Sequence, residues 1–128
     1  MIFLSLGGGL EALHGFKIGW YVDVGNDMRR LMFTLAHAHG TALALVNIAA
    51  GLTARRFDNL DFSSSVTASL IWAGILFPLG FILGGVVTYG GDPGLGIWLV
   101  PVAAILLFYS VLSIARIVSA RLRTAKKR

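Results

Sequence analysis

The sequence predicts an all-α, polytopic membrane protein in which four transmembrane helices form an up-down bundle. Apolar residues make up 56% of the 128 residues, charged residues only 13%, and the mean hydropathy is +0.79. Soluble domains carry about 25% charged residues, so a chain this apolar is better matched to lipid than to water. The apolar residues also gather in four stretches, each close to the roughly 20 residues that a membrane-crossing helix needs.

The four helices are expected at about residues 2–20, 31–52, 66–89 and 97–118. The first stretch lacks the basic start and cleavage site of a removed signal peptide, so we expect it to be retained. Arg29–Arg30 and Arg55–Arg56 mark the ends of the second, and the turn-forming run Gly90–Gly94 precedes the fourth. Short connections make consecutive helices antiparallel neighbours. Residues 1–128 thus form one transmembrane domain, with a basic tail at 119–128.

Lysine and arginine residues predict the orientation, because cytoplasmic loops carry an excess of them. With the C-terminal end inside, eight basic residues lie on the inner side, and Lys17, Arg29 and Arg30 lie on the outer side. Both termini are then cytoplasmic, in a multi-pass protein of the inner membrane. The tail residues expected to meet lipid head groups and fix this topology are Arg121, Arg123, Lys126, Lys127 and Arg128. No aromatic residues interleave with these charges, so nucleic acid is not an expected partner.

Ionisable residues inside the first two stretches point to function, since such groups are costly in hydrocarbon. Glu11 and His14 lie about one helical turn apart, and His37 and His39 lie in the second stretch. Helix rise, about 1.5 Å per residue, places His14 and His37 at one depth below the outer surface. Glu11, His14, His37 and Thr41 are then expected to converge. His39 is rotated by about 200° from His37, so one of the two faces the first helix and the other faces the third helix, the fourth helix or a partner chain.

Four interpretations of these residues stay open. Carboxylate and imidazole suit a transition metal, with Glu11, His14 and His37 as ligands. Imidazoles suit haem, with His14, His37 and His39 as cofactor-binding residues. The same groups suit interhelical hydrogen bonds, or a path for protons or small solutes. Cysteine is absent and no serine or threonine has an activating motif, so catalysis is not favoured.

Small residues predict where helices pack closely, because they let backbones approach. The predicted packing residues are Gly8, Ala12, Gly15 and Gly19 on the first helix, and Gly80 and Gly84 on the third. The small residues of the first helix recur at spacings of three and four and so share one face. We expect the second helix to pack against this face.

Three strings, Glu11–Lys17, Leu35–Gly40 and Gly91–Gly96, resemble those of small, uncharacterised bacterial inner-membrane proteins with Glu-x-x-His and His-x-His-Gly motifs. The resemblance implies a four-helix membrane protein and no known activity. The favoured function is an accessory or structural subunit of a larger membrane complex or a homo-oligomer. Its partners are the lipid bilayer and other membrane subunits or a second copy. The alternatives are an intramembrane metal- or haem-binding redox protein and a proton or small-solute pathway.

Overall fold

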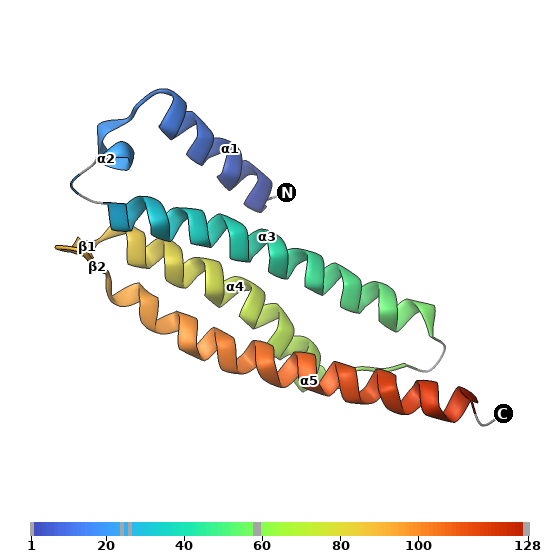
Figure 1. The fold of residues 1–128 in the computed structure, drawn as a ribbon. Helices are drawn as coiled ribbons and strands as arrows, with labels where there is room; N and C mark the ends of the chain where they lie inside the picture. The colour runs from blue at the N-terminus through green and yellow to red at the C-terminus, as the bar shows by residue number, and fades with distance from the viewer. Residues whose placement is uncertain (1, 24, 26, 58–59, 127–128) are drawn as a thin grey trace.

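The computed structural model has an all-helical architecture and describes residues 2–23, 25, 27–57 and 60–126 (Figure 1). Two short helices begin the chain, α1 (Ile2–Gly15) and α2 (Gly19–Val22). Three long helices follow, α3 (Asp27–Arg56), α4 (Ser64–Val86) and α5 (Leu99–Lys126). Between α4 and α5 lie a two-stranded antiparallel ribbon, β1 (Thr88–Tyr89) and β2 (Asp92–Pro93), and the 3₁₀ helix η1 (Leu95–Trp98).

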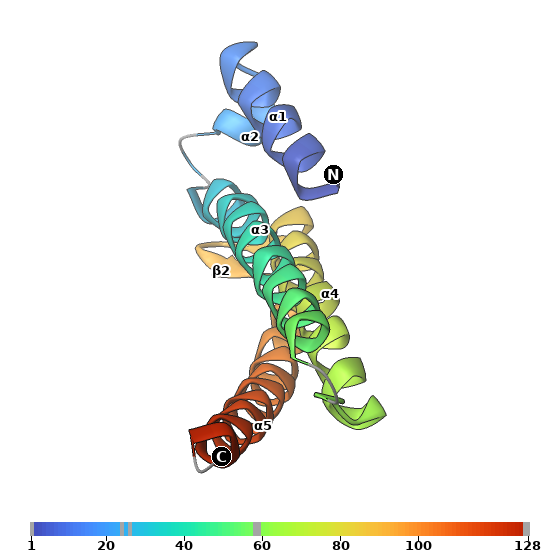
Figure 2. The ribbon, with the colours of Figure 1, turned by 90° about the vertical axis from the view of Figure 1, so that its right-hand side faces the viewer.

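The helices form an open row in the order α1, α3, α4, α5. The main contacts join α1 to α3, α3 to α4, and α4 to α5 with η1. Figure 2 shows the same order from the side, with α1 and α5 at the two ends of the row. The all-helical architecture agrees with the prediction, but the up-down four-helix bundle is not confirmed.

Three helices of the described chain are long and apolar enough to cross a membrane: Asp27–Arg56, Ser64–Val86 and Leu95–Thr124. They correspond to the second, third and fourth expected helices. The first expected helix is different, because α1 has 14 residues. At about 1.5 Å per residue it is roughly 21 Å long, short of a hydrocarbon core of about 30 Å. A fourth crossing by residues 2–20 is therefore not confirmed.

The first expected helix is broken by a helix-ending turn at Lys17. This residue has a φ of 51°, in the left-handed region that a residue just past a helix end often adopts. The amide of Lys17 donates to the carbonyl of His14 (3.1 Å), and the amide of Ile18 donates to that of Leu13 (3.0 Å). This pair of bonds is the Schellman motif, which satisfies the last carbonyls of a helix. The chain then turns, and α2 begins at Gly19.

The long helices extend beyond the apolar stretches that predicted them. α3 begins four residues earlier and ends four residues later than expected, so it includes the arginine pairs at both ends. α4 begins after Ser63, whose hydroxyl accepts from the amide of Val66 (3.4 Å) as an N-cap. α5 continues through the expected tail as far as Lys126, with Arg121 and Arg123 exposed on it. Lys127 and Arg128 lie outside the described residues.

Glycines bring α4 close to both of its neighbours. A Cβ on Gly85 would lie 2.9 Å from Cβ of Met32 on α3. A Cβ on Gly80 would lie 2.9 Å from Val100 and 3.2 Å from the carbonyl oxygen of Gly96. The amide of Gly94 also donates to the carbonyl of Gly84 (2.8 Å), which ties the connection after β2 back onto α4. The core of the row is therefore a close approach of backbones around α4.

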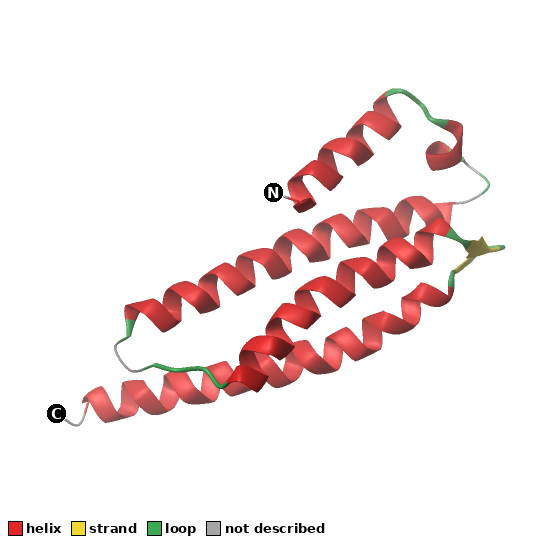
Figure 3. Cartoon of the chain, turned by 180° about the vertical axis from the view of Figure 1, so that it is seen from behind, coloured by secondary structure: helices red, strands yellow, loops and turns green. Residues whose placement is uncertain are grey.

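The segment between α3 and α4 covers part of α5. Seen from behind, the loop that leads into α4 runs beside the later turns of α5 (Figure 3). Leu60 in this loop is buried and lines a small crevice together with Val118 and Leu122 of α5. Part of the second half of α5 is thus packed against the described residues of this loop.

Candidate functional site

The position of the predicted polar residues depends on the register between α1 and α3. The Phe3 ring lies where a side chain on Gly40 would be, and Gly7 faces the ring of His37. Leu10 and Phe33 share one buried cluster. The two helices are therefore antiparallel, and continuing this register places His14 level with Arg30. His14 lies seven residues beyond Gly7, roughly 10 Å further along α1 than the level of His37.

His37 joins α1 to α3. Its Nδ1 lies 2.9 Å from the carbonyl oxygen of Phe3, so the ring nitrogen donates to that oxygen. The ring fits because residue 7 is glycine: a Cβ there would lie 2.5 Å from Cε1 of His37. A backbone carbonyl of one helix is thus bound by a side chain of the next, the kind of polar contact that holds membrane helices together.

His39 faces the opposite neighbour, as the rotation of about 200° predicts. Its Nδ1 lies 2.9 Å from the carbonyl oxygen of Leu35 in the same helix. Its ring stacks on Phe77 of α4, with centroids 5.4 Å apart and planes 9° apart, and lies 4.9 Å from the ring of Phe81. His39 is therefore an aromatic packing residue between α3 and α4.

The expected ligand sets are not assembled in this structure. Within residues 2–23, 25, 27–57 and 60–126, no group of three or more histidine, aspartate or glutamate side chains could hold a metal ion. His14 is exposed at the end of α1, while His37 faces α1 and His39 faces α4. Thr41, the fourth expected member of the cluster, has a buried hydroxyl with no hydrogen-bond partner in the described chain.

Glu11 and His14 instead line an open cleft at one end of the row. The cleft has a volume of about 920 Å³ and lies between α1, α2 and the first two turns of α3. Its polar lining consists of Glu11, His14, Asp27, Arg30 and Thr34. Its apolar lining consists of Leu10, Tyr21, Met28 and Leu31. We refer to it below as the α1–α3 cleft.

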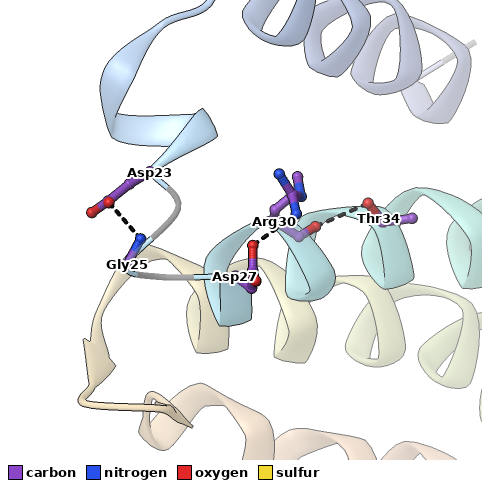
Figure 4. Close-up of polar contacts among 5 residues, drawn as sticks. All are labelled: Asp23, Gly25, Asp27, Arg30 and Thr34. Atoms are coloured by element: carbon purple, nitrogen blue, oxygen red, sulfur yellow. Dashed lines mark hydrogen bonds and ion pairs between the residues drawn. The ribbon is translucent and has the colours of Figure 1, made fainter.

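The charged side chains of the α1–α3 cleft are only partly paired. Nη2 of Arg30 lies 2.7 Å from Oδ1 of Asp27, and the hydroxyl of Thr34 donates to the carbonyl of Arg30 (2.9 Å). Figure 4 shows the Arg30 side chain rising from α3 toward α1, with Asp27 beside it. Glu11 and His14 are exposed and have no hydrogen-bond or ion-pair partner among the residues described. The cleft therefore presents a guanidinium, a paired carboxylate and an unpaired carboxylate together.

Arg29 is a central residue that sequence reasoning missed. Its Nε donates to the carbonyl of Gly85 on α4 (3.2 Å), and its Nη1 donates to the carbonyl of Trp20 on α2 (2.9 Å). The guanidinium also lies 4.6 Å from the centre of the Trp20 ring, a cation–π contact. Three helices meet at this side chain. In the sequence it is one of two adjacent arginines, and no pattern separates it from Arg30.

The predicted packing residues divide into two groups. Gly80 and Gly84 lie at the contact of α4 with η1 and α5. Gly8, Gly15 and Gly19 have open space where a Cβ would be, and Ala12 is exposed, so this face does not seat α3. The close contact of α1 uses Gly7 and, on α3, Gly40. The physical reason is the position of His37, whose ring needs the missing Cβ at residue 7.

No protein-family model, no curated protein and no solved structure matches the chain. The described chain offers three helices suited to crossing a membrane, a histidine that joins α1 to α3, and a polar cleft at one end of the row.

Proposed function

We propose that the chain is a small integral membrane protein that acts as an accessory or structural subunit of a membrane complex or a homo-oligomer. The observation that carries this proposal is the exposed face of α5. In the most apolar 18-residue window of Leu95–Thr124 only 11% of the residues are buried, against 28% in Asp27–Arg56 and 33% in Ser64–Val86. A helix at the end of an open row leaves most of its surface to lipid or to partner helices.

The exposed side chains of α5 follow helical spacing. Together with the last residue of η1, six of its exposed large apolar side chains are Trp98, Val102, Ile105, Phe108, Tyr109 and Leu112; Val111 and Leu122 are exposed as well. Steps of three and four residues place most of these on one face, the pattern through which helices pack on one another. Ile105 and Phe108, at 71% and 69% exposure, form the centre of this stripe. We call this set the α5 stripe and propose it as the contact with other membrane helices.

The polar side chains inside the row support a structural role. Nδ1 of His37 and Nδ1 of His39 each bind a backbone carbonyl oxygen. Asn47 behaves in the same way, since its amide donates to the carbonyl of Leu43 (2.9 Å) and reaches that of Leu70 on α4 (3.5 Å). Such bonds satisfy polar groups in an apolar environment and fix neighbouring helices.

We further propose that the basic end of the row lies in the cytoplasm, in a bacterial inner membrane. The ends of α3 and α5 carry Arg55, Arg56, Arg116, Arg121 and Arg123, whereas the opposite end carries more acidic than basic residues. Excess basic charge favours the cytoplasmic side. The expectation that both termini are cytoplasmic depends on a fourth crossing, and α1 reaches only the level of Gly40. We therefore propose a cytoplasmic location for the C-terminal end alone.

Single-cysteine variants test the subunit role, because the chain contains no cysteine of its own. We expect Ile105→Cys on the α5 stripe to cross-link to a second copy or to a larger subunit when membranes are treated with a short bifunctional maleimide. The matched control is Ile48→Cys, an exposed isoleucine on α3. Cross-links at residue 105 and none at residue 48 support the proposal. Equal labelling of both by a lipid-soluble maleimide, with only monomers on the gel, contradicts it.

The orientation is tested with the same approach. We expect Gly91→Cys, at the ribbon end, to react with a membrane-impermeant maleimide added to intact cells. Ser119→Cys, near the basic end of α5, is expected to react only after the cells are opened. Both positions are exposed, so the difference reports the side of the membrane. The reverse labelling pattern would show the opposite orientation.

A further inference from the structure

We infer that the α1–α3 cleft binds the head group of a phospholipid that carries a primary ammonium next to its phosphate. The cleft joins one guanidinium, from Arg30, to two carboxylates, from Glu11 and Asp27. A phosphate diester with an ammonium two carbons away presents the complementary pair of charges. Guanidinium groups recognise phosphate oxygens through several N–H donors, and carboxylates accept from an ammonium.

The position of the cleft along the row matches the head-group layer. Its lining on α3 runs from Asp27 to Thr34, which is roughly 10 Å at about 1.5 Å per residue. α3 begins at Asp27, so these residues form the end of a helix suited to crossing the membrane. The polar layer on each side of a bilayer is about 6 Å thick. The cleft thus spans the head groups and the first carbons of the acyl chains.

The side chains that line the cleft have hydrogen-bonding groups left for both the phosphate and the ammonium of the ligand. Arg30 has five N–H donors, and its ion pair with Asp27 uses a single Nη2. Glu11 is an exposed carboxylate with no partner in the described chain. An anionic head group without an ammonium would meet repulsion from Glu11 and Asp27. A head group whose nitrogen is fully methylated would offer no N–H donor to either carboxylate.

Apolar side chains in the same cleft favour a lipid over a free solute. Leu10, Met28 and Leu31 line it beside the charged groups. Leu31 is 49% exposed, on the surface of a helix suited to crossing the membrane. Acyl chains leaving the head group would therefore continue over an apolar surface suited to lipid. Soluble molecules with the same charges would gain no such contact.

Native mass spectrometry of the delipidated protein in detergent tests the inference. We expect a one-to-one adduct with phosphatidylethanolamine at lower lipid concentration than with phosphatidylcholine or phosphatidylglycerol of the same acyl chains. Glu11→Gln is expected to weaken phosphatidylethanolamine binding by about threefold to fivefold, the range for a partly exposed ion pair. Arg30→Gln is expected to weaken all three lipids. Asp61→Asn, an exposed acid in the loop before α4, is the matched control and is expected to change nothing.

A charge reversal makes the result independent of any loss of folding. We expect Glu11→Lys to invert the preference, so that phosphatidylglycerol binds more tightly than phosphatidylethanolamine. Equal binding of phosphatidylethanolamine by the wild type, Glu11→Gln and Glu11→Lys would overturn the inference. So would a wild-type preference for phosphatidylglycerol. Glycerophosphoethanolamine, the soluble head group, is the last competitor: full displacement of the lipid at equal concentration would show that the ligand is a solute and not a lipid.

Discussion

Two helix contacts in this protein both depend on glycine, and they are built differently. At the contact of α4 with η1 and α5, Gly80 faces Cγ2 of Val100 and the carbonyl oxygen of Gly96, and Gly84 faces the amide nitrogen and Cβ of Ile97. At the contact of α1 with α3, Gly7 faces one side chain, that of His37, while Gly8, Gly9 and Gly15 face open space. The first contact is a close approach of two backbones. The second is a fit of two rings beside glycines: the His37 ring at Gly7, hydrogen-bonded to the carbonyl of Phe3, and the Phe3 ring at Gly40.

This difference indicates that α5 is held to α4 more firmly than α1 is held to α3. Close backbone packing leaves no room for a neighbour to move, so any added atom must displace a helix. A side chain held in a gap can rotate away, and α1 then depends on few bonds. The α1–α2 segment is attached through His37 to Phe3, through Arg29 to Trp20, and through the cluster of Leu10, Tyr21 and Phe33. We expect α1 to separate from α3 before α4 separates from α5.

The largest expected effect comes from adding a side chain at the backbone contact. Gly80→Val places its new atoms against Val100 and the carbonyl of Gly96, so we expect the free energy of unfolding to fall by about 3 kcal/mol. The matched control is Gly8→Val, which adds the same atoms to a helix where nothing lies within 4 Å. Its expected change is within about 0.5 kcal/mol. Unfolding in mixed detergent, followed by circular dichroism, measures both; equal losses would show that Gly80 does not lie at a close contact.

The next effect concerns the arginine at which three helices meet. Arg29→Met keeps the length of the side chain and removes its bonds to Gly85 and Trp20, so we expect a loss of about 2 kcal/mol. Arg30→Met is the adjacent control. Its partner is Asp27, in an ion pair whose side chains are 42% and 69% exposed, and such pairs contribute about 0.5 kcal/mol or less. If both variants lost equal stability in the same unfolding assay, Arg29 would have no special role.

The helix row could largely be predicted from the sequence, because it depends on the length of apolar stretches. Helices near residues 31–52, 66–89 and 97–118 appear as α3, α4 and η1 with α5. These features are local, or repeat with the period of the helix, so no knowledge of the neighbouring elements is needed.

The site could not be predicted, because it depends on one turn. The expected depth of His14 was counted along a helix continuing to Trp20, but Lys17 adopts a left-handed conformation and ends α1 at Gly15. Glycine is the usual residue at such a position, so a lysine gives no signal. The turn shifts α1 along α3, which brings Gly7 and not His14 to the level of His37. The expected cluster of Glu11, His14 and His37 is lost for that reason.

A double-mutant cycle sharpens the description of the α1 contact. We expect His37→Ala and Gly7→Ala each to cost about 1.5 kcal/mol, the first by removing the bond to Phe3 and the second by displacing the ring. In the double variant the methyl group that Gly7→Ala adds occupies the space that the ring leaves, and alanine favours the helix over glycine. The combined cost should then be well below the sum of the two. Additive costs, measured in the same unfolding assay, would mean that Gly7 and His37 do not act as a unit.

The smallest expected effect comes from removing one interhelical hydrogen bond between α4 and α5. The same kind of change at the contact of α1 with α3 gives the comparison. Between α4 and α5 the hydroxyls of Ser65 and Tyr109 lie 3.2 Å apart, both on exposed residues. Because glycine packing already fixes α4 against η1 and the start of α5, we expect Tyr109→Phe to cost about 0.5 kcal/mol or less. His37→Ala removes one such bond at α1 and should cost more, and hydrogen exchange should show faster opening of residues 2–15 only there. A larger loss in Tyr109→Phe than in His37→Ala would mean that side-chain bonds, and not close backbone packing, hold α5 to α4.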